Sequence, residues 1–357
     1  MPGESRPGRA AVIAGLGAWL PPTIVTNDDL AKHLDTSDAW IRERTGIHAR
    51  RRVSPGMSTG DMATEAGRLA LKASGSADAD AVVLATTTPD RRCPGTAPEV
   101  ASRLGLTGTA AFDVSAVCTG FVYGLGVGAG LIAAGIAERV LLIGAEAFST
   151  ILDPADRVTA AIFGDGAGAV VLRAGDPEEP GAIGPVTLGS DGGQSDLIMI
   201  PGGGARQRSA GTEAGPKDHY FTMNGPDTYR HAVERTTATA RLALDKAGWL
   251  PDDVDRFAAH QANARIVGSV ADRLGIPAGE RRLSNIDQVG NTAAASVPIL
   301  LAQSAAAGTL RAGHRTLLAA FGGGLTWGAG TVVWPETTSL VATGADSDSA
   351  AQTADAS

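Results

Sequence analysis

The sequence predicts an α/β protein made of two similar halves, each rich in strand–helix–strand units. Residues 114–137 begin as a strand and continue as an uncharged run of small residues. Residues 292–308 form a second uncharged run, rich in Ala and Ser, and an apolar segment follows each run, at 140–144 and 316–320. Runs of this kind suit two central helices that bury each other between strands. The repeated order indicates an internal duplication.

Length and composition fit a large buried core. The chain has 357 residues, 43% of them hydrophobic and 19% charged, which suffices for one large core or two smaller ones. Aromatic residues make up only 4% of the chain, whereas there are 47 glycines. Helices and backbones must therefore pack by close approach rather than through large side chains.

The expected domain limits follow composition. We place the N-terminal half at residues 10–178 and the C-terminal half at 179–337, because the Pro-, Gly- and Glu-containing stretch 176–184 suits a connection. Residues 1–9 are predicted to be a flexible N-terminus. Residues 338–357 consist mainly of Ala, Ser, Thr and Asp and are predicted to be a disordered tail.

Several classes of protein are disfavoured. The net charge of -8 argues against nucleic-acid binding, and two cysteines are too few for a disulfide framework, which favours a reducing cytoplasm. The first nine residues lack the apolar segment of a signal peptide. The 114–137 run is long enough to span a bilayer, but it starts as a strand and contains several glycines, so no membrane helix is expected. The six histidines are scattered, so no metal site is expected. The glycine clusters 124–130 and 164–168 lack the strand–loop–helix context and acidic partner of a nucleotide loop, so no dinucleotide site is expected.

Cys118 stands where a strand meets the first turn of a long small-residue helix, in the stretch Asp113–Val122. N–H groups at a helix N-terminus favour negative charge, so the thiolate is expected to be stabilised and Cys118 is a candidate nucleophile. The alternative is a buried structural cysteine, since free cysteines are among the most buried residues.

His260 and Asn291 stand at two further strand-to-helix junctions. His260 follows the strand-like segment 254–259, and Asn291 follows a glycine at the start of the second small-residue run. Taken singly, the histidine reads as a core residue and the asparagine as a turn or cap. Together with Cys118 they form a set, because open α/β sheets place their ligand crevices at such junctions.

These motifs resemble those of β-ketoacyl-acyl carrier protein synthase III, a thiolase-fold condensing enzyme. The likeness rests on Cys118, on His260 in the sequence HQAN, on Asn291 in GNTAAASVP and on the segment 321–328, FGGGLTWG. Further matches lie at residues 35–47, 153–157 and 163–168, and the likeness covers about residues 10–336. It implies a thiolase-like fold of two pseudo-symmetric halves in a layered α-β-α-β-α architecture.

The resemblance also implies roles for the catalytic residues. Cys118 would take a short acyl group from acyl-CoA, and the N–H groups of Cys118 and Gly323 would form the oxyanion hole. His260 and Asn291 would donate to the enolate that malonyl-acyl carrier protein gives on losing CO2. The enolate would then attack the acyl-enzyme to give 3-ketoacyl-acyl carrier protein. Coenzyme A and phosphopantetheine are substrates here, and no cofactor is expected.

Other positions match the family's coenzyme A site. Trp40 and Arg157 match the aromatic residue and arginine that hold the adenine, Arg44 lies near for the phosphates, and Asn263 matches a contact to the pantetheine arm. Without the resemblance, Trp40 would be interpreted as a core residue of a helix face.

Two basic residues match positions that face the acidic carrier protein or nucleotide phosphates, namely Arg230 and Arg265. The chain departs from the family at Asp272, where lysine is frequent, and at Val117 and Thr119, where smaller residues usually flank the nucleophile. Residues 205–219 are expected to form a variable loop near the entrance.

The acyl pocket is expected to involve Cys93 and Phe321. In the family, the loop holding Cys93 reaches the pocket of the partner subunit of a homodimer, and phenylalanine precedes the proline in enzymes restricted to very short acyl groups. Cys93 would leave extra apolar volume for longer or branched primers. Phe321 would form an apolar wall that disfavours the malonyl carboxylate, or simply pack in the core.

Rival functions differ at identifiable residues. A degradative thiolase would need a second cysteine near the C-terminus, and none follows Cys118. A thiolase-fold acyltransferase that uses a non-malonyl acceptor commonly lacks the asparagine, whereas Asn291 is present; a silent binding module would have lost the nucleophile. The favoured function is decarboxylative condensation that initiates fatty-acid or polyketide-type chains, and the motifs leave the pathway open.

Overall fold

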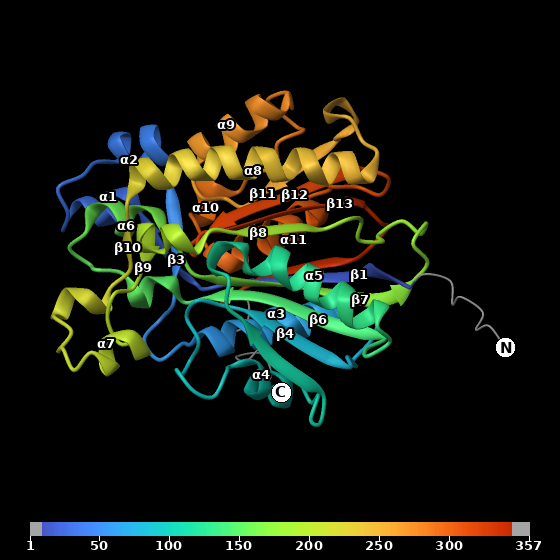
Figure 1. The fold of residues 1–357 in the computed structure, drawn as a ribbon, viewed down its shortest axis with the longest axis horizontal. Coiled ribbons are helices and arrows are strands. Elements are labelled where there is room, and N and C mark those ends of the chain that lie inside the picture. The colour runs from blue at the N-terminus through green and yellow to red at the C-terminus, as the bar shows by residue number, and fades with distance from the viewer. Residues whose placement is uncertain (1–8, 345–357) are drawn as a thin grey trace, which may run out of the picture.

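Helices and sheets alternate in five layers across residues 9–344, the part of the chain that the computed structural model describes (Figure 1). Two helices cover the outer face of each sheet, and two more lie between the sheets. These helices are α3 (Thr59–Ala73) and α4 (Ala97–Arg103) on the first sheet, α8 (Gly225–Ala247) and α9 (Ala264–Leu274) on the second, and α5 (Gly120–Ala133) and α11 (Ser296–Ala306) in the centre. The predicted thiolase-like α-β-α-β-α architecture is confirmed.

The first sheet has the strand order β14-β1-β7-β6-β4-β5. Strand β4 is parallel to both of its neighbours, whereas β7 is antiparallel to β6 and to β1. Its strands are β1 (Ala10–Leu20), β4 (Ala81–Ala85), β5 (Ala110–Val114), β6 (Arg139–Glu146), β7 (Gly166–Gly175) and β14 (Ser339–Thr343).

The second sheet repeats this pattern with the strand order β11-β12-β13-β8. A parallel pair, β11–β12, is continued by two antiparallel pairs, as β4–β6 is in the first sheet. An isolated parallel bridge between Phe257 and Arg282 stands beside β11, as β5 stands beside β4. The strands are β8 (Thr187–Ser190), β11 (Arg256–Ala259), β12 (Arg315–Gly322) and β13 (Thr326–Val333). The topology therefore bears out the internal duplication.

The C-terminal segment differs from its prediction. Residues 338–344 belong to the predicted disordered tail, but β14 pairs in parallel with β1 from Leu16 to Leu20, and the Ser339 hydroxyl donates to the carbonyl of Ala302 at 2.8 Å. Backbone pairing to an edge strand orders this segment despite its polar composition. Residues 345–357, and residues 1–8 of the predicted flexible N-terminus, lie outside the described residues. The predicted boundary at residues 178 and 179 falls in the connection between β7 and β8.

The uncharged run 114–137 is divided between three elements. Strand β5 ends at Val114, a 3-10 turn η1 spans Val117–Thr119, and α5 occupies the next 14 residues. Within residues 9–344, no helix is both long and apolar enough to cross a membrane. Close packing of the central layer depends on small residues: a Cβ at Gly168 of β7 would lie 2.6 Å from the Ile299 nitrogen of α11.

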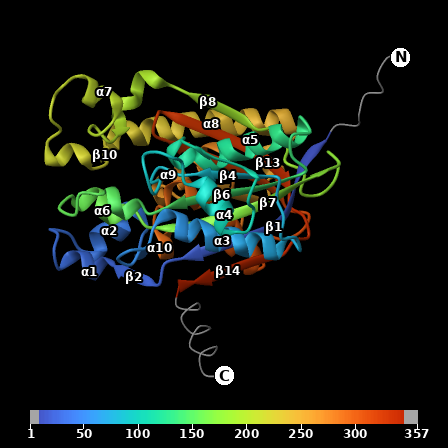
Figure 2. The same ribbon diagram turned by 90° about the horizontal axis from the view of Figure 1, so that it is seen from below.

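Short elements gather at one end of the molecule, on the left in Figures 1 and 2. They connect the layers around the cavity described below. These elements are two antiparallel strand pairs, β2 (Thr23–Thr26) with β3 (Ala49–Arg52) and β9 (Ile198–Met199) with β10 (Thr222–Met223), and the helices α1 (Asn27–Ala31), α2 (Asp38–Thr45), α6 (Arg157–Ile162) and α7 (Ala205–Ser209). The helix α10 (Ile286–Val289) and the 3-10 turn η6 (Ala293–Ala295) lead into α11.

Candidate active site

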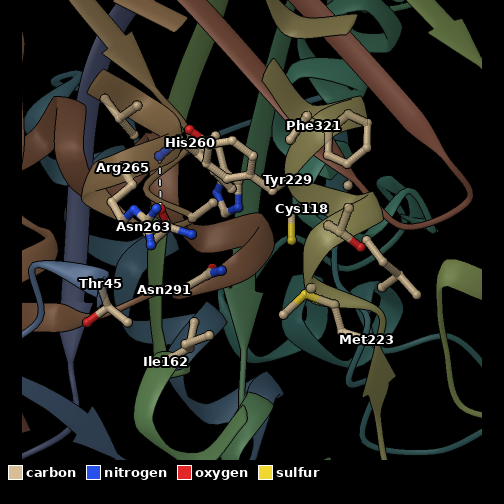
Figure 3. A pocket seen from close by; sticks show the side chains of 18 of the residues that line it. Thr45, Cys118, Ile162, Met223, Tyr229, His260, Asn263, Arg265, Asn291 and Phe321 are labelled. Carbon is tan, nitrogen blue, oxygen red and sulfur yellow. Dashed lines mark hydrogen bonds between the residues drawn. The ribbon is translucent and has the colours of Figure 1, made fainter. Parts of the chain in front are cut away.

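A cavity of about 590 Å³ lies where the two halves meet. Its wall is mostly apolar and carries Cys118 from the first half and His260 and Asn291 from the second (Figure 3). Apolar walls with few polar groups are typical of small-molecule sites. The structure therefore brings together the three residues that the sequence predicted as a catalytic set, although they are more than 30 residues apart in every pair.

Cys118 sits at the centre of the 3-10 turn that precedes α5. The residue before it, Val117, has a φ of 47°, a left-handed conformation that is unfavourable for a β-branched residue. Backbone strain of this kind persists only where the surrounding structure holds it, and it concentrates at functional sites. The turn thus presents the sulfur of Cys118 to the cavity at a conformational cost.

The electrostatics of Cys118 differ from the sequence prediction. Burial raises the pKa of the Cys118 thiol well above its ordinary value, and the nearby Glu146 carboxylate raises it further. Desolvation disfavours the charged form more strongly than the helix N-terminus stabilises it. Cys118 is therefore a thiol, not a standing thiolate, in this structure at neutral pH.

His260 follows the last residue of β11 and is 5% exposed. Its backbone N–H donates to the Ala319 carbonyl at 2.8 Å, which continues the β11–β12 pairing to the site. Burial lowers the pKa of His260 to about 3, so the imidazole is neutral at pH 7. No residue of the described chain bonds its buried Nδ1 atom. A neutral imidazole has one N–H donor and one acceptor nitrogen for chemistry in the cavity.

Asn291 is held by its backbone and by its own side-chain oxygen. Its N–H donates to the Ile162 carbonyl at 2.9 Å, and its carbonyl accepts from Gly164 at 3.0 Å. The Oδ1 atom accepts the N–H of Ala293 at 2.9 Å. The Asn291 side chain is 4% exposed and lines the cavity. Because its Oδ1 atom is already bonded, the Nδ2 amide is the group that can donate into the cavity.

The glycine turn at the end of β12 lies against the 3-10 turn that holds Cys118. A Cβ at Gly322 would lie 2.8 Å from the Cys118 nitrogen, so only glycine permits this approach. Gly322 lines the cavity, and Phe321 beside it lines the cavity as well. Gly323, the predicted oxyanion donor, is the next residue of the turn, and a Cβ there would lie 3.3 Å from Val117 Cγ2.

Trp40 and Arg44 of α2 line one end of the cavity, as expected for a coenzyme A site. The guanidinium carbon of Arg44 lies 4.8 Å from the Trp40 ring centroid, and that of Arg157 lies 5.3 Å from it. Arg157 also donates to the Asp35 carbonyl at 2.8 Å. Two cations thus surround one indole ring, an arrangement that cation–π attraction stabilises.

Asn263 and Arg265 lie on the cavity wall near His260. The Asn263 Oδ1 atom accepts the N–H of Ile266 at 2.9 Å and so caps α9. Arg265 lies 6.0 Å from the centroid of the Tyr229 ring. Asn263 thus combines a local structural role with its place in the cavity.

Four predicted site residues lie outside the cavity wall, and one of them is Gly323 of the glycine turn. Arg157 contacts Trp40 without lining the cavity, and Arg230 is exposed and pairs with Asp227 at 3.2 Å. Cys93 is exposed as well, on a loop whose Arg92 donates to the Gly203 carbonyl at 2.8 Å. Cys93 therefore does not line this cavity within one chain.

Glu146, at the end of β6, was missed by the sequence reasoning. It is 0% exposed and accepts hydrogen bonds from Thr87 N–H at 3.0 Å, from the Thr88 hydroxyl at 2.7 Å and from the Ala294 N–H. Burial raises its pKa to about 7. The available signal was a lone acidic residue two positions after the apolar segment 140–144.

The remaining cavity wall also escaped prediction, because its residues are ordinary apolar side chains. Phe163 stacks on Phe148 with a centroid distance of 4.2 Å, and Phe221 meets both rings edge-on. Residues 205–219, predicted as an entrance loop, contain α7 and do not line the cavity themselves, although their neighbours do. Within residues 9–344, no cluster of His, Cys, Asp and Glu could hold a metal ion.

Two halves of one topology, with Cys, His and Asn side chains at their junction, define a thiolase-like condensing acyltransferase. The family models for 3-oxoacyl-[acyl-carrier-protein] synthase III match residues 112–192, and those for its C-terminal part match residues 244–334. The chain belongs to this family of condensing enzymes.

Similar proteins cover nearly the whole chain. Beta-ketoacyl-[acyl-carrier-protein] synthase III 5 of Streptomyces coelicolor is 56% identical over 331 residues, which are 93% of this chain and 99% of the relative. The crystal structure of 3-oxoacyl-(acyl carrier protein) synthase III from Pseudomonas aeruginosa has a TM-score of 0.86 at 49% identity, covering 92% of this chain and 99% of the other. The priming β-ketosynthase of the R1128 polyketide biosynthetic pathway has a TM-score of 0.85 at 32% identity, covering 94% and 99%.

Proposed function

We propose that this protein loads a short acyl group from acyl-CoA onto Cys118 and condenses it with malonyl-acyl carrier protein to give 3-ketoacyl-acyl carrier protein. The observation that carries the proposal is the meeting of Cys118, His260 and Asn291 on the wall of one largely apolar cavity. The reaction would initiate fatty-acid or polyketide-type chains.

In the first half-reaction, the sulfur of Cys118 attacks the thioester carbonyl of acyl-CoA. Because burial raises the pKa of Cys118, the proton leaves the sulfur as the new C–S bond forms, and coenzyme A departs as the thiol. The negative charge on the carbonyl oxygen is stabilised by the N–H groups of Cys118 and Gly323. Close packing of the two turns supports this assignment, since preorganised donors are effective only when their positions are fixed.

In the second half-reaction, malonyl-acyl carrier protein loses CO2 to form an enolate. Its thioester oxygen accepts hydrogen bonds from His260 and from the Nδ2 amide of Asn291. A neutral imidazole with a pKa of about 3 suits this role, because it donates without requiring a proton from solution. The enolate carbon then attacks the acyl carbonyl on Cys118, the C–S bond breaks, and the released sulfur takes up a proton.

Phe321 supports the loss of CO2 by presenting an apolar surface to the carboxylate. It packs with Leu325 and Ala232 and lines the cavity beside Cys118. An apolar wall destabilises a carboxylate relative to neutral CO2.

Coenzyme A enters between α2 and α9. Trp40, Arg44 and Arg157 hold the nucleotide end, while Asn263 contacts the pantetheine arm further in. Arg265 and Arg230 attract the acidic carrier protein. The continuity of the cavity from Trp40 to Cys118 supports this path.

The enzyme acts as a homodimer in the cytoplasm. Strand β5 forms the edge of the first sheet, and its Phe112 is 37% exposed, which suits pairing with a second copy. The exposed loop of Cys93 would then reach the partner's acyl pocket. Both cysteines are free thiols, in keeping with a reducing compartment.

The full chain, incubated with acetyl-CoA and malonyl-acyl carrier protein, tests the proposal. Intact-protein and peptide mass spectrometry should find an acetyl group on Cys118 alone, and product analysis should find 3-ketobutyryl-acyl carrier protein. The Cys93→Ala variant should label normally and Cys118→Ala not at all. Label surviving in Cys118→Ala would overturn the assignment of the nucleophile. Acylation without decarboxylation of the malonyl substrate would instead indicate an acyltransferase with a different acceptor.

A further inference from the structure

Thr119, the residue after the nucleophile, is 0% exposed and bonds across the site to a distant residue. Its hydroxyl lies 2.6 Å from the Ala116 carbonyl oxygen and is paired with the hydroxyl of Thr326, at the start of β13. The Thr326 hydroxyl in turn lies 2.9 Å from the Gly323 carbonyl and 3.3 Å from that of Ala116. A pair of hydroxyls therefore connects the turn of Cys118 with the turn of Gly323.

The hydrogen count makes the pair act as a unit. Each threonine hydroxyl has one hydrogen to donate and can accept as well. When the Thr119 hydroxyl donates to Ala116, that of Thr326 donates to Thr119; when the Thr326 hydroxyl donates to Gly323, that of Thr119 donates to Thr326. The two hydrogens make two bonds, so in either direction the bond between the hydroxyls joins the two turns and one of the two carbonyls, that of Ala116 or that of Gly323, accepts from the pair.

Each turn has a backbone that needs such support. The peptide fixed at the Ala116 carbonyl directly precedes Val117, whose φ of 47° is strained. The Gly323 carbonyl belongs to a run of three glycines, which have no side chains of their own to restrict the backbone. The two carbonyls lie one peptide away from the N–H groups of Cys118 and Gly323 respectively.

We propose that Thr119 and Thr326 are positioning residues whose paired hydroxyls align the N–H groups of Cys118 and Gly323 on a single oxyanion. The inference rests on the proposed function, since it concerns the acyl transfer to Cys118. Neither threonine touches the reacting atoms; each acts through the backbone that it holds.

Matched variants distinguish a role of the hydroxyls in aligning the oxyanion donors from a role of the threonine side chains in packing. Thr119→Val keeps the shape of the side chain and removes the hydroxyl, whereas Thr119→Ser keeps the hydroxyl. The same pair of changes applies to Thr326. Thr316→Val is a control on strand β12, because Thr316 is buried and, among residues 9–344, its hydroxyl bonds only the His314 carbonyl, at 3.2 Å.

Single-turnover acylation of the full-length protein by acetyl-CoA gives the limiting rate and the half-saturating concentration. Removing an entire oxyanion donor typically lowers a rate by about 10²–10³-fold, so misaligning the donors should lower the limiting rate by about tenfold or more. The half-saturating acetyl-CoA concentration should stay within about twofold of wild type, because substrate binding does not use the oxyanion.

Alkylation of Cys118 by iodoacetamide is the companion measurement. It displaces iodide from a saturated carbon and forms no oxyanion, so its rate reports whether the nucleophile is intact. We expect Thr119→Val to alkylate at the wild-type rate, Thr119→Ser to recover acylation, and the double variant Thr119→Val/Thr326→Val to acylate no more slowly than the slower single variant.

Three results would overturn the inference: wild-type acylation in Thr119→Val, a serine variant as slow as the valine variant, or a parallel loss of alkylation. Failure of the wild-type protein to acylate at all, while it still alkylates, would overturn the proposed function together with the inference. The two failures are thus distinguishable.

Discussion

Gly322 approaches Cys118 so closely that a Cβ at position 322 would stand 2.8 Å from the Cys118 nitrogen and 3.1 Å from that of Thr119. The atoms it would meet belong to the backbone and cannot rotate away. The residue type at one turn is therefore dictated by a second turn some 200 positions away in the chain.

Alanine at position 322 should push the two turns apart. We expect Gly322→Ala to lower the acylation rate by a factor of about one hundred, the scale on which the loss of an oxyanion donor acts. Single-turnover acylation measures the effect. Gly268→Ala is the matched control, because Gly268 lies in α9 and an added Cβ there would meet nothing within 4 Å. This control variant should acylate normally. Equal acylation by both variants would show that the turns tolerate separation.

Substitution of Asn291 should separate the half-reactions. Asn291→Asp keeps an oxygen for the N–H of Ala293, which now bonds Oδ1 at 2.9 Å, but it loses the amide donor. We expect this variant to load Cys118 and to lose condensation by about one hundredfold or more. Asn291→Ala should behave alike, with an added loss of stability from the missing acceptor. The measurements are acetyl loading by mass spectrometry and ketoacyl product formation, and an equal loss of both steps would contradict this division.

The buried carboxyl of Glu146 should make stability depend on pH. Because burial raises its pKa from 4.5 to about 7, the native protein holds more protons than the unfolded chain between those values, and stability falls as pH rises through this window. Glu146→Gln removes that loss, so the variant should gain on the order of 3 kcal/mol relative to wild type between pH 5 and pH 9.

Denaturant unfolding at several pH values measures this difference. The histidine at the site has its pKa lowered to about 3, so it gives the opposite slope, but it is present in both proteins and cancels in the comparison. Glu280→Gln, at a side chain 95% exposed, is the control and should show no pH-dependent gain. A constant difference between wild type and Glu146→Gln across pH would contradict the buried-charge explanation.

Primer choice should respond to Cys93 although it lies on the surface of the single chain. We expect acetyl-, butyryl- and isobutyryl-CoA all to load wild-type enzyme, and Cys93→Phe to reduce butyryl relative to acetyl loading by about tenfold, because each buried CH2 contributes about 0.8 kcal/mol. Competition assays measure the ratio. Cys93→Ser, of similar size, should change it little, and a strict acetyl preference unaltered by Cys93→Phe would exclude this residue from the pocket.

The sequence was sufficient to predict the architecture and the three residues that meet in the cavity. Two uncharged small-residue runs, each followed by an apolar strand, indicated the duplicated halves, and local motifs identified Cys118, His260 and Asn291. Such features depend on neighbours a few positions away, such as the strand ends before Cys118 and His260 and the glycine before Asn291. The predicted strand before Asn291 was wrong, because the helix α10 precedes it. Local patterns, together with the family resemblance, therefore sufficed to find the three residues.

Only the tertiary structure decided how those residues behave and what supports them. The pKa of Cys118 rises rather than falls because the surrounding packing removes it from water, a property that no helix start reveals by itself. Strand β14 is ordered because it pairs with β1, more than 300 residues earlier, although the composition of its own segment predicted disorder. Contacts between the two halves determine the roles of Glu146, Gly322 and the Thr119–Thr326 pair. Burial and long-range contacts arise only on folding, so the residues that support the site could not be predicted from the sequence, whereas those proposed to carry its chemistry could.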